Sequence, residues 1–315
     1  MSLEVFFVLF ASVCQVQQAT SWGYSGSEGP ANWYKSYPTC NKRRQSPIHL
    51  LESEANYKSF SPFQFTGYGL TSSSNFQLEN NGHTLQMSLK NWNGMSVRAF
   101  GKIFRPWQIH FHWGATDSVG SEHSMKYQNS HLHPGEMHFV HVNTAYDNVS
   151  VALTKYDGLM VFGTVMEIDP NGKNNSFISK LTPFLSNITL GKTKVEIQPF
   201  PLNDAFMVPN NTFYHYNGSL TTPPCSEAVQ WVVFTKEITI SHAQMTDFRK
   251  LLHHKTMKPA NETEYLSNNY RPIQQRNGRT IYRSFKQSPS SAVSIQLSFC
   301  ALMVILASFL YLKME

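Results

Sequence analysis

The sequence predicts a single, mainly β domain with peripheral helices. Short runs of alternating or apolar β-type residues recur, and Gly, Pro, Asn and Ser separate them, as is typical of a sheet-rich fold. The runs cover 62–68, 84–90, 104–113, 136–143, 159–168, 194–199, 213–216 and 228–235. Helical periodicity is clear mainly over 241–253, where Ser241 can cap the helix and an apolar stripe follows. The stripe consists of Met245, Phe248, Leu251 and Leu252.

The composition supports a globular chain. Of the 315 residues, 41% are hydrophobic and 13% aromatic, which is enough for a large core. The body of the chain has no low-complexity linker, repeat or break in composition, so we expect one domain. The formal net charge is +6, with scattered Lys and Arg, and this argues against nucleic acid as a partner.

The first 20 residues are typical of a secretory signal peptide. A short apolar run at 4–13 is followed by small residues suited to cleavage near 19–21, after Ala19 or Ser21, although the usual N-terminal positive charge is missing. The domain should therefore occupy about 21–288, with cleavage removing the segment before it.

The C-terminal segment is also processed in our interpretation. Residues 292–312 are nearly continuous apolar sequence, long enough for a span of about 20 residues. A hydrophobic tail that ends the chain after small residues favours a GPI-attachment signal over 289–315 instead. We expect attachment at Ser290, with Ser288 or Ser291 as alternatives. The mature protein would then lie on the extracellular face of the plasma membrane, anchored in the membrane by lipid.

Cysteines and glycosylation motifs fit this route. Cys14 and Cys300 lie in the two segments expected to be removed, so Cys40 and Cys225 remain to form one disulfide. Asn-x-Ser/Thr motifs give N-glycosylation candidates at Asn148, Asn174, Asn187, Asn210 and Asn261. A further motif begins at Asn217, but it abuts a stretch that we expect to be buried, so we predict that it is unmodified.

Residues 108–113, QIHFHW, place two imidazoles in an otherwise apolar strand. Residues two apart in a strand share a face, so His110 and His112 project together with Gln108. Neutral imidazoles at this spacing can share one zinc ion. A third ligand from a neighbouring strand could be His138 in EMHFVHV, where Glu136 shares its face and His141 points away. His131 and His133 in SHLHP are rivals that spacing does not exclude.

The chain also resembles a known family through motifs in a fixed order. QIHFHWG (108–114), GSEHSMKYQ (120–128), EMHFVH (136–141) and NGSLTTPPC (217–225) are similar to those of the α-class carbonic anhydrases. Further similar motifs are WGY (22–24), RRQSPIHL (43–50), NNGHTL (80–85), DGLMVFG (157–163), QWVVF (230–234) and NYRPIQ (269–274). The resemblance implies a large, twisted, mostly antiparallel central sheet with a conical active-site cavity, and zinc-dependent hydration of carbon dioxide to bicarbonate.

The resemblance also assigns roles to residues. It implies zinc ligands His110, His112 and His138, with Gln108 and Glu136 holding ligand imidazoles. It places His131 and His133 in a variable loop and makes His141 structural. Catalytic positions would be His83 as proton shuttle, Thr221 as the residue that orients the attacking hydroxide, and Glu122 as its partner. The substrate pocket would consist of Val140, Val161, Leu220, Thr222, Val229 and Trp231, and cavity waters would be organised by Tyr24 and Gln86.

The disulfide and the two terminal signals resemble those of the GPI-anchored types IV and XV, although mammalian type IV members carry a second N-terminal cysteine pair that this chain lacks. Sulfonamide-type inhibitors are then expected ligands. The alternative function is a catalytically silent carbonic-anhydrase-like domain for adhesion or receptor binding. Such domains typically lose a zinc-ligand histidine, whereas all three positions are His here.

Overall fold

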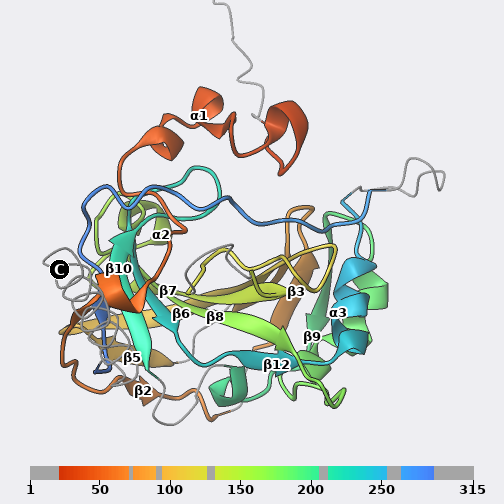
Figure 1. Cartoon of the computed structure of the whole chain (residues 1–315). Helices are drawn as coiled ribbons and strands as arrows, with labels where there is room; N and C mark the ends of the chain where they lie inside the picture. Colours follow the sequence, from red (N-terminus) through yellow and green to blue (C-terminus); the bar gives the residue numbers. More distant parts are fainter. Residues whose placement is uncertain are drawn as a thin grey trace, which may run out of the picture.

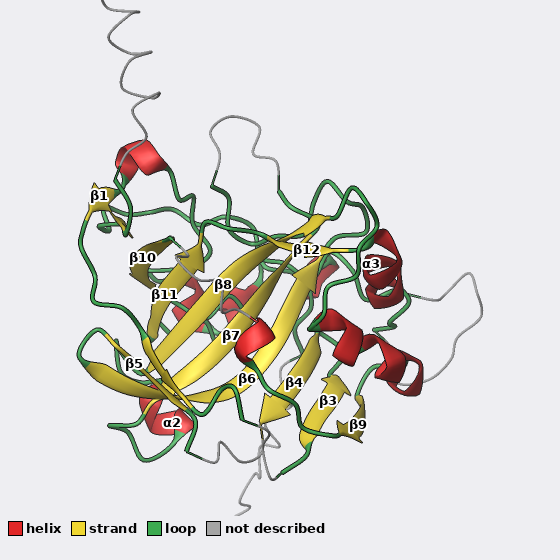
Figure 2. Cartoon of the chain, turned by 90° about the horizontal axis from the view of Figure 1, so that it is seen from below, coloured by secondary structure: helices red, strands yellow, loops and turns green. Residues whose placement is uncertain are grey.

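A computed structural model describes residues 21–70, 74–89, 94–125, 132–205, 212–253 and 264–286. Within these residues, one 13-stranded sheet runs through the molecule, and short helices lie at its periphery (Figure 1). The predicted mainly β, single-domain fold is confirmed. The strands β10, β11, β8, β7, β6, β4, β3 and β9 lie side by side in that order across the twisted sheet (Figure 2).

The strands have the following bounds: β1 Asn56–Tyr57, β2 Gln64–Thr66, β3 Phe76–Asn80, β4 Leu85–Leu89, β5 Ser96–Ala99, β6 Lys102–Trp113, β7 Gly135–Asn143, β8 Leu159–Ile168, β9 Thr193–Ile197, β10 Phe213–Gly218, β11 Val229–Phe234, β12 Ile238–Ile240 and β13 Tyr282–Arg283. The α-helices are α1 Trp33–Ser36, α2 Val149–Ala152 and α3 His242–Arg249. The 3-10 helices are η1 Gly26–Glu28, η2 Pro38–Asn41, η3 Glu52–Glu54, η4 Ile178–Lys180, η5 Thr182–Ile188 and η6 Asn203–Ala205.

Most strand pairs are antiparallel, as predicted. The sheet is nevertheless mixed, because β11 and β12 both pair with β8 in parallel and β1 pairs with β13 in parallel. Each of the eight predicted strand segments overlaps an observed strand. The strands β1, β3, β5, β12 and β13 were not predicted, because two to five residues give too little alternation to stand out from the surrounding loops.

The predicted helix over 241–253 is shorter than expected. Ser241 and Gln244 form a capping box at its start, and α3 ends at Arg249. The backbone N–H of Leu252 donates instead to the carbonyl of Thr189, which takes this residue out of the helical pattern. Leu251 and Leu252 are still buried, so the apolar stripe belongs to the core although its last part is not helical.

Alternate residues of the long strands feed two buried clusters on opposite faces of the sheet. Ile109, Phe111 and Phe139 belong to the larger cluster, which α3 covers through Phe248, 5.2 Å from Phe111 between ring centroids. Val140, Val161 and Trp231 belong to the smaller cluster on the other face. The period of two thus separates the scaffold face of the sheet from the face that carries the functional side chains.

The predicted signal peptide and GPI signal, including Ser288, Ser290 and Ser291, lie outside the described residues. Among the residues that are described, none of the helices has the length and apolar character needed to cross a membrane.

Candidate metal centre

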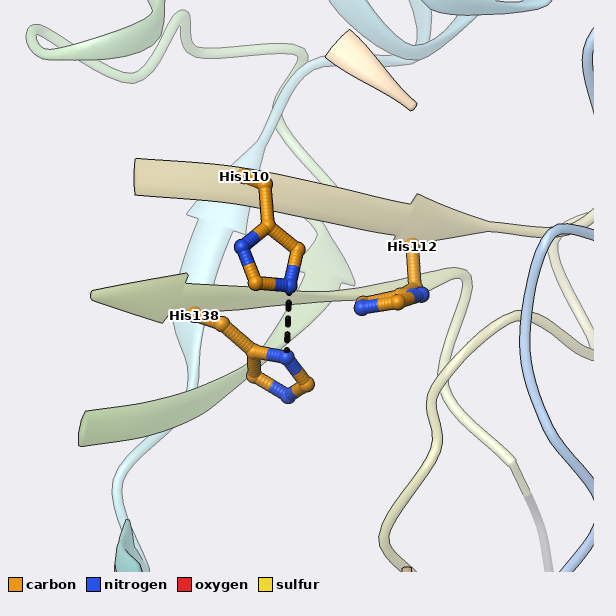
Figure 3. A group of neighbouring side chains, drawn as sticks. All are labelled: His110, His112 and His138. Atoms are coloured by element: carbon orange, nitrogen blue, oxygen red, sulfur yellow. Dashed lines mark hydrogen bonds between the residues drawn. The ribbon is translucent and has the colours of Figure 1, made fainter. Parts of the chain in front are cut away.

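Three histidines meet on one face of the central sheet. His110 and His112 are on β6, and His138 lies directly opposite His110 on the antiparallel strand β7. Figure 3 shows the three rings converging from these two strands. Their nitrogens lie within 4.8 Å of one another, and the rings of His112 and His138 are buried. The same-face prediction for the HxH pair therefore agrees with the geometry.

A hydrogen bond from one nitrogen of each ring determines which other nitrogen has a lone pair that can bind a metal ion. His110 Nδ1 donates to Gln108 Oε1 at 2.9 Å, and His112 Nδ1 donates to the backbone carbonyl of Asn269 at 2.7 Å. His138 Nε2 donates to Glu136 Oε1 at 2.9 Å. Because each partner is an acceptor, the remaining lone pairs are on Nε2 of His110, Nε2 of His112 and Nδ1 of His138.

These three nitrogens suit a metal ion. Nε2 of His110 and Nδ1 of His138 face each other at 3.2 Å, and Nε2 of His112 is buried with no hydrogen-bond partner in the described part of the chain. Burial lowers the pKa of His112 to about 4 and the pKa of the other two below the usual value, so the rings are neutral ligands. A neutral three-histidine set with an open side is typical of catalytic zinc sites.

The carboxylate of Glu136 organises the inner wall of the site. Its Oε1 accepts from His138 and from His123 Nδ1 at 2.7 Å, and its Oε2 accepts from the backbone N–H groups of Glu122 and His123. Burial raises the pKa of this carboxyl, but the neighbouring His123 and these hydrogen bonds outweigh that effect and hold the pKa well below its usual range. The anion therefore persists in a fully buried position.

Sequence reasoning missed the role of His123. Its Nε2 lies 2.7 Å from the hydroxyl of Tyr216, which in turn donates to Ser46 Oγ at 2.9 Å. A second group that could hold a metal ion consists of His123, Glu136 and His138. Hydrogen bonds from both imidazoles to Glu136 already explain why these atoms lie close together. The signal available was the motif GSEHSMKYQ, in which His123 follows Glu122 directly.

Glu122 is a second buried carboxyl beside the histidines. Its Oε1 accepts from the backbone N–H of Arg271 at 2.9 Å and lies 3.5 Å from His112 Nδ1. Burial raises its pKa to about 7, and the nearby His138 and Thr221 act in the opposite direction without outweighing it. The structure thus brings the buried Thr221 near Glu122, whose Oε2 is buried and has no hydrogen-bond partner in the described part of the chain.

The other histidines near these strands have different environments. His141 is fully buried on the opposite face, where its Nδ1 lies 3.1 Å from the carbonyl of Phe139 and burial lowers its pKa to about 3. His133 Nδ1 lies 2.8 Å from Glu167 Oε2, away from the cluster that can hold a metal. His131 lies outside the described residues.

His83 lies in the loop between β3 and β4 and is stacked on Trp22, with ring centroids 3.9 Å apart. Burial lowers its pKa to about 4, helped by the nearby His253. Gln86 on β4 lies opposite His110, and its amide donates to Ser88 Oγ at 2.8 Å.

The hydroxyl of Tyr24 is buried and has no hydrogen-bond partner in the described part of the chain, and burial raises its pKa well above the usual value, with Glu122 adding to the rise. Burial and the nearby carboxyl therefore keep this phenol protonated.

The predicted apolar wall forms one patch beside the histidines. Val140 lies opposite Val161, and Val161 lies opposite Trp231, whose ring centroid is 4.8 Å from that of His138. Val229 is buried in the same cluster, and Leu220 packs against its edge. Thr222 follows Thr221 and is partly exposed.

The predicted disulfide between Cys40 and Cys225 is present, with an S–S distance of 2.07 Å. Arg271 ties this bridge to the site, because its guanidinium donates to the Cys40 carbonyl at 3.0 Å while its backbone N–H donates to Glu122. The bridge therefore braces the chain that follows Thr221.

The glycosylation candidates Asn148, Asn174 and Asn187 are exposed, and Asn210 and Asn261 lie outside the described residues. One prediction is wrong: we expected burial of the segment around Asn217 to keep this residue from solvent, but its side chain is exposed. The neighbours Tyr216 and Gly218 are buried because alternate residues of β10 face opposite sides.

The mainly β fold and the three-histidine centre define a protein with a catalytic-type metal site on its central sheet. The eukaryotic-type carbonic anhydrase family matches residues 28–285. Carbonic anhydrase 7 of Homo sapiens is 35% identical over 271 residues, covering 84% of this chain and 97% of that protein. Carbonic anhydrase 6 of Homo sapiens is 35% identical over 291 residues, covering 90% of each chain. Carbonic anhydrase 15 of Mus musculus is 33% identical over 302 residues, covering 91% of this chain and 90% of that protein.

The chain therefore belongs to the eukaryotic-type carbonic anhydrases. Members of this family use zinc and hydrate carbon dioxide, and the cluster of His110, His112 and His138 is able to hold the ion.

Proposed function

We propose that this chain is a catalytically active carbonic anhydrase that acts at the extracellular face of the plasma membrane. The observation that carries the activity is the convergence of three lone pairs on Nε2 of His110, Nε2 of His112 and Nδ1 of His138, each fixed by an acceptor behind it. A silent binding domain has no need of this hydrogen-bond arrangement around three neutral imidazoles.

Bound zinc supplies a Lewis acid that lowers the pKa of water to about 7, as is established for carbonic anhydrases. The protein's own residues would then position the reactants. Thr221 would orient the attacking hydroxide, because its own proton would be donated to the unpartnered Oε2 of Glu122 and its oxygen would remain able to accept. The backbone N–H of Arg271 holds the Glu122 carboxyl in place for this contact.

Carbon dioxide is small and uncharged, so an apolar surface next to the nucleophile suits it. Val140, Val161 and Trp231 provide that surface on the same face as His138. Thr222 and Leu220 lie on the loop that borders it. The polar groups of Tyr24 and Gln86 would order water on the opposite side of the site, where Gln86 adjoins His110.

Hydration releases a proton that must leave for the cycle to continue. His83 would carry it to buffer, because an imidazole with a pKa near 6.5 exchanges protons readily at neutral pH. Stacked on Trp22, the ring has a pKa of about 4. We therefore infer that His83 takes up the proton when it leaves this stacked position.

The proposed location rests on the two terminal segments. The signal at 1–20 would direct the chain into the secretory route, and the segment 289–315 would be exchanged for a lipid anchor near Ser290. The disulfide between Cys40 and Cys225 fits an oxidising compartment.

Stopped-flow measurement of carbon dioxide hydration tests the activity. The zinc-loaded domain, about 21–288, should be active and inhibited by a sulfonamide, and changing any ligand histidine to Ala should remove both zinc and nearly all activity. A domain that binds zinc stoichiometrically yet does not accelerate hydration would establish the silent alternative.

A separate experiment tests the location. A phosphatidylinositol-specific phospholipase should release the protein from the surface of cells that express the full chain. Full retention after treatment would contradict the GPI anchor, and it would leave the measured hydration activity of the domain unaffected.

A further inference from the structure

The exposed Asn217 lies beside a pocket that is separate from the metal centre. The pocket has a volume of about 550 Å³ and includes Asn217 and Gln230 in its wall. Asn217 lies opposite Gln230, Gln230 opposite Met160, and Met160 opposite His141. These residues share the sheet face that points away from the ligand histidines, so an occupant of this pocket would not obstruct the metal centre.

Aromatic rings and polar groups share the wall of the pocket. Five rings line it: Phe60, Phe100, Tyr156, His215 and Tyr282. His215 is stacked on Phe100 with ring centroids 4.4 Å apart, and Phe60 lies 5.8 Å from the same imidazole. Such ring faces pack well against the C–H groups of a sugar. Polar groups of Ser59, Ser61 and Gln230 lie among the rings and can bond to hydroxyl or acetamido groups.

The charged groups in the wall of the pocket are two lysines, Lys58 and Lys102. Lys102 is paired with Asp157, which compensates its charge. The ammonium of Lys58 lies over the rings of Phe60 and Tyr282, at 5.4 Å and 4.7 Å from their centroids. The Lys58 ammonium keeps its charge over these rings and can donate to a hydroxyl or acetamido oxygen of a sugar.

Asn217 is also the acceptor residue of a glycosylation motif, Asn217-Gly218-Ser219. The motif's hydroxyl is buried in the folded protein, where Ser219 Oγ accepts from the backbone N–H of Ser46 at 2.9 Å and donates to the carbonyl of Leu220 at 2.7 Å. A glycosyltransferase can bind this hydroxyl only before the segment folds. The modification would thus have to occur during chain entry, and the exposed Asn217 side chain lets the folded protein carry it.

We propose that Asn217 carries an N-linked glycan whose first sugars lie in the aromatic pocket beside β10. In the transfer, Asn217 Nδ2 forms a bond to the anomeric carbon of an N-acetylglucosamine, and the bond from that carbon to a lipid pyrophosphate donor breaks. The pyrophosphate leaves with the electron pair, and a base takes one Nδ2 proton. The inference rests on the secretory route proposed above, and it replaces the expectation that Asn217 is unmodified.

Glycopeptide mass spectrometry on the full chain, expressed in cells with N-glycosylation, tests the modification. The peptide that contains Asn217 should carry a glycan, and N217Q should lose one glycan-sized electrophoretic shift with unchanged carbon dioxide hydration. The matched control Q230N alters the same pocket and leaves the motif intact, so it should keep the shift. If Asn148 or Asn187 is occupied and Asn217 is not, the proposal is wrong while the secretory route stands. If no motif is occupied, both are wrong.

Hydrogen exchange tests the contact with the pocket. Backbone amides of 58–61 and 100–102 should exchange more slowly in the glycosylated protein than in N217Q. Trimming the glycan to a single N-acetylglucosamine should keep this protection, and complete enzymatic removal should abolish it. Equal exchange in the glycosylated protein and in N217Q would overturn the placement of the sugars in the pocket.

Discussion

Replacing Glu136 by Gln isolates the contribution of one carboxylate to zinc binding. The carboxylate accepts four N–H donors, from the rings of His138 and His123 and from the backbone of Glu122 and His123. A Gln side chain is nearly isosteric but has only one acceptor oxygen. Whichever way the amide is turned, its NH₂ group faces two of the donors that Glu136 satisfied.

The expected magnitudes follow from that count. Two buried donors that lose their acceptor cost about 1–3 kcal/mol each, so the free energy of unfolding should fall by about 2–6 kcal/mol. Loss of a partner behind a metal ligand typically weakens metal binding by about 10–100-fold. For zinc this corresponds to about 1.4–2.7 kcal/mol, because a tenfold change is about 1.4 kcal/mol. Where the NH₂ group faces His138, that ring loses its acceptor and can adopt the other tautomer.

Zinc affinity would be measured by stripping the metal and titrating it back against a coloured chelator, with urea unfolding as the stability readout. The matched control is Glu167→Gln, which alters a carboxylate at 2.8 Å from His133 outside the metal cluster. It should leave zinc affinity unchanged. If Glu136→Gln binds zinc as tightly as the parent, the proposed role of this carboxylate in orienting His138 is wrong.

Three further predictions concern the proton path, the disulfide and acid stability. His83→Ala should slow hydration in weak buffer and recover in imidazole buffer, and Trp22→Ala should raise the His83 pKa from about 4 in an NMR titration, since burial lowers it. Cys40→Ser should lower the free energy of unfolding by about 2–4 kcal/mol, and adding Cys225→Ser should cost nothing more. Burial lowers the pKa of His141 to about 3 in the folded protein, whereas the unfolded chain protonates this residue below about 6.5. The free energy of unfolding should therefore fall as the pH is lowered from about 6.5 to about 3. His141→Gln should reduce that slope by about 1.4 kcal/mol per pH unit in urea titrations; parallel slopes would contradict the assignment.

The sequence predicted the sheet because its central strands are long and strongly patterned. The alternation in 108–112 was enough to predict that two histidines share one face, and in β6 they do. Spacing did not choose between His138 and the histidines of SHLHP, because the choice depends on which strand lies beside β6. The family resemblance made that choice, and β7 is the neighbour.

The partners behind the ligand rings were partly beyond sequence reasoning. Gln108 and Glu136 are two residues from the histidines they hold, so strand geometry indicated them. The acceptor for His112 is the carbonyl of Asn269, which is 157 residues away along the chain. A backbone carbonyl leaves no signature in residue types, and only the fold brings it to the ring.

The position of His138 also depends on an irregularity in the sheet. Pro106 lies opposite His141, but Gln108 lies opposite Val140, so the register between β6 and β7 shifts at Trp107. The burial of β6 changes phase at the same point: Phe104 and Ile109 lie in the same cluster although five residues separate them. Without the shift, Pro106 opposite His141 would continue into His110 opposite Met137, and His138 would face the other side of the sheet from His110. A proline cannot donate to the ladder, which favours a bulge next to it. The bulge is therefore what places the third imidazole on the face of the other two.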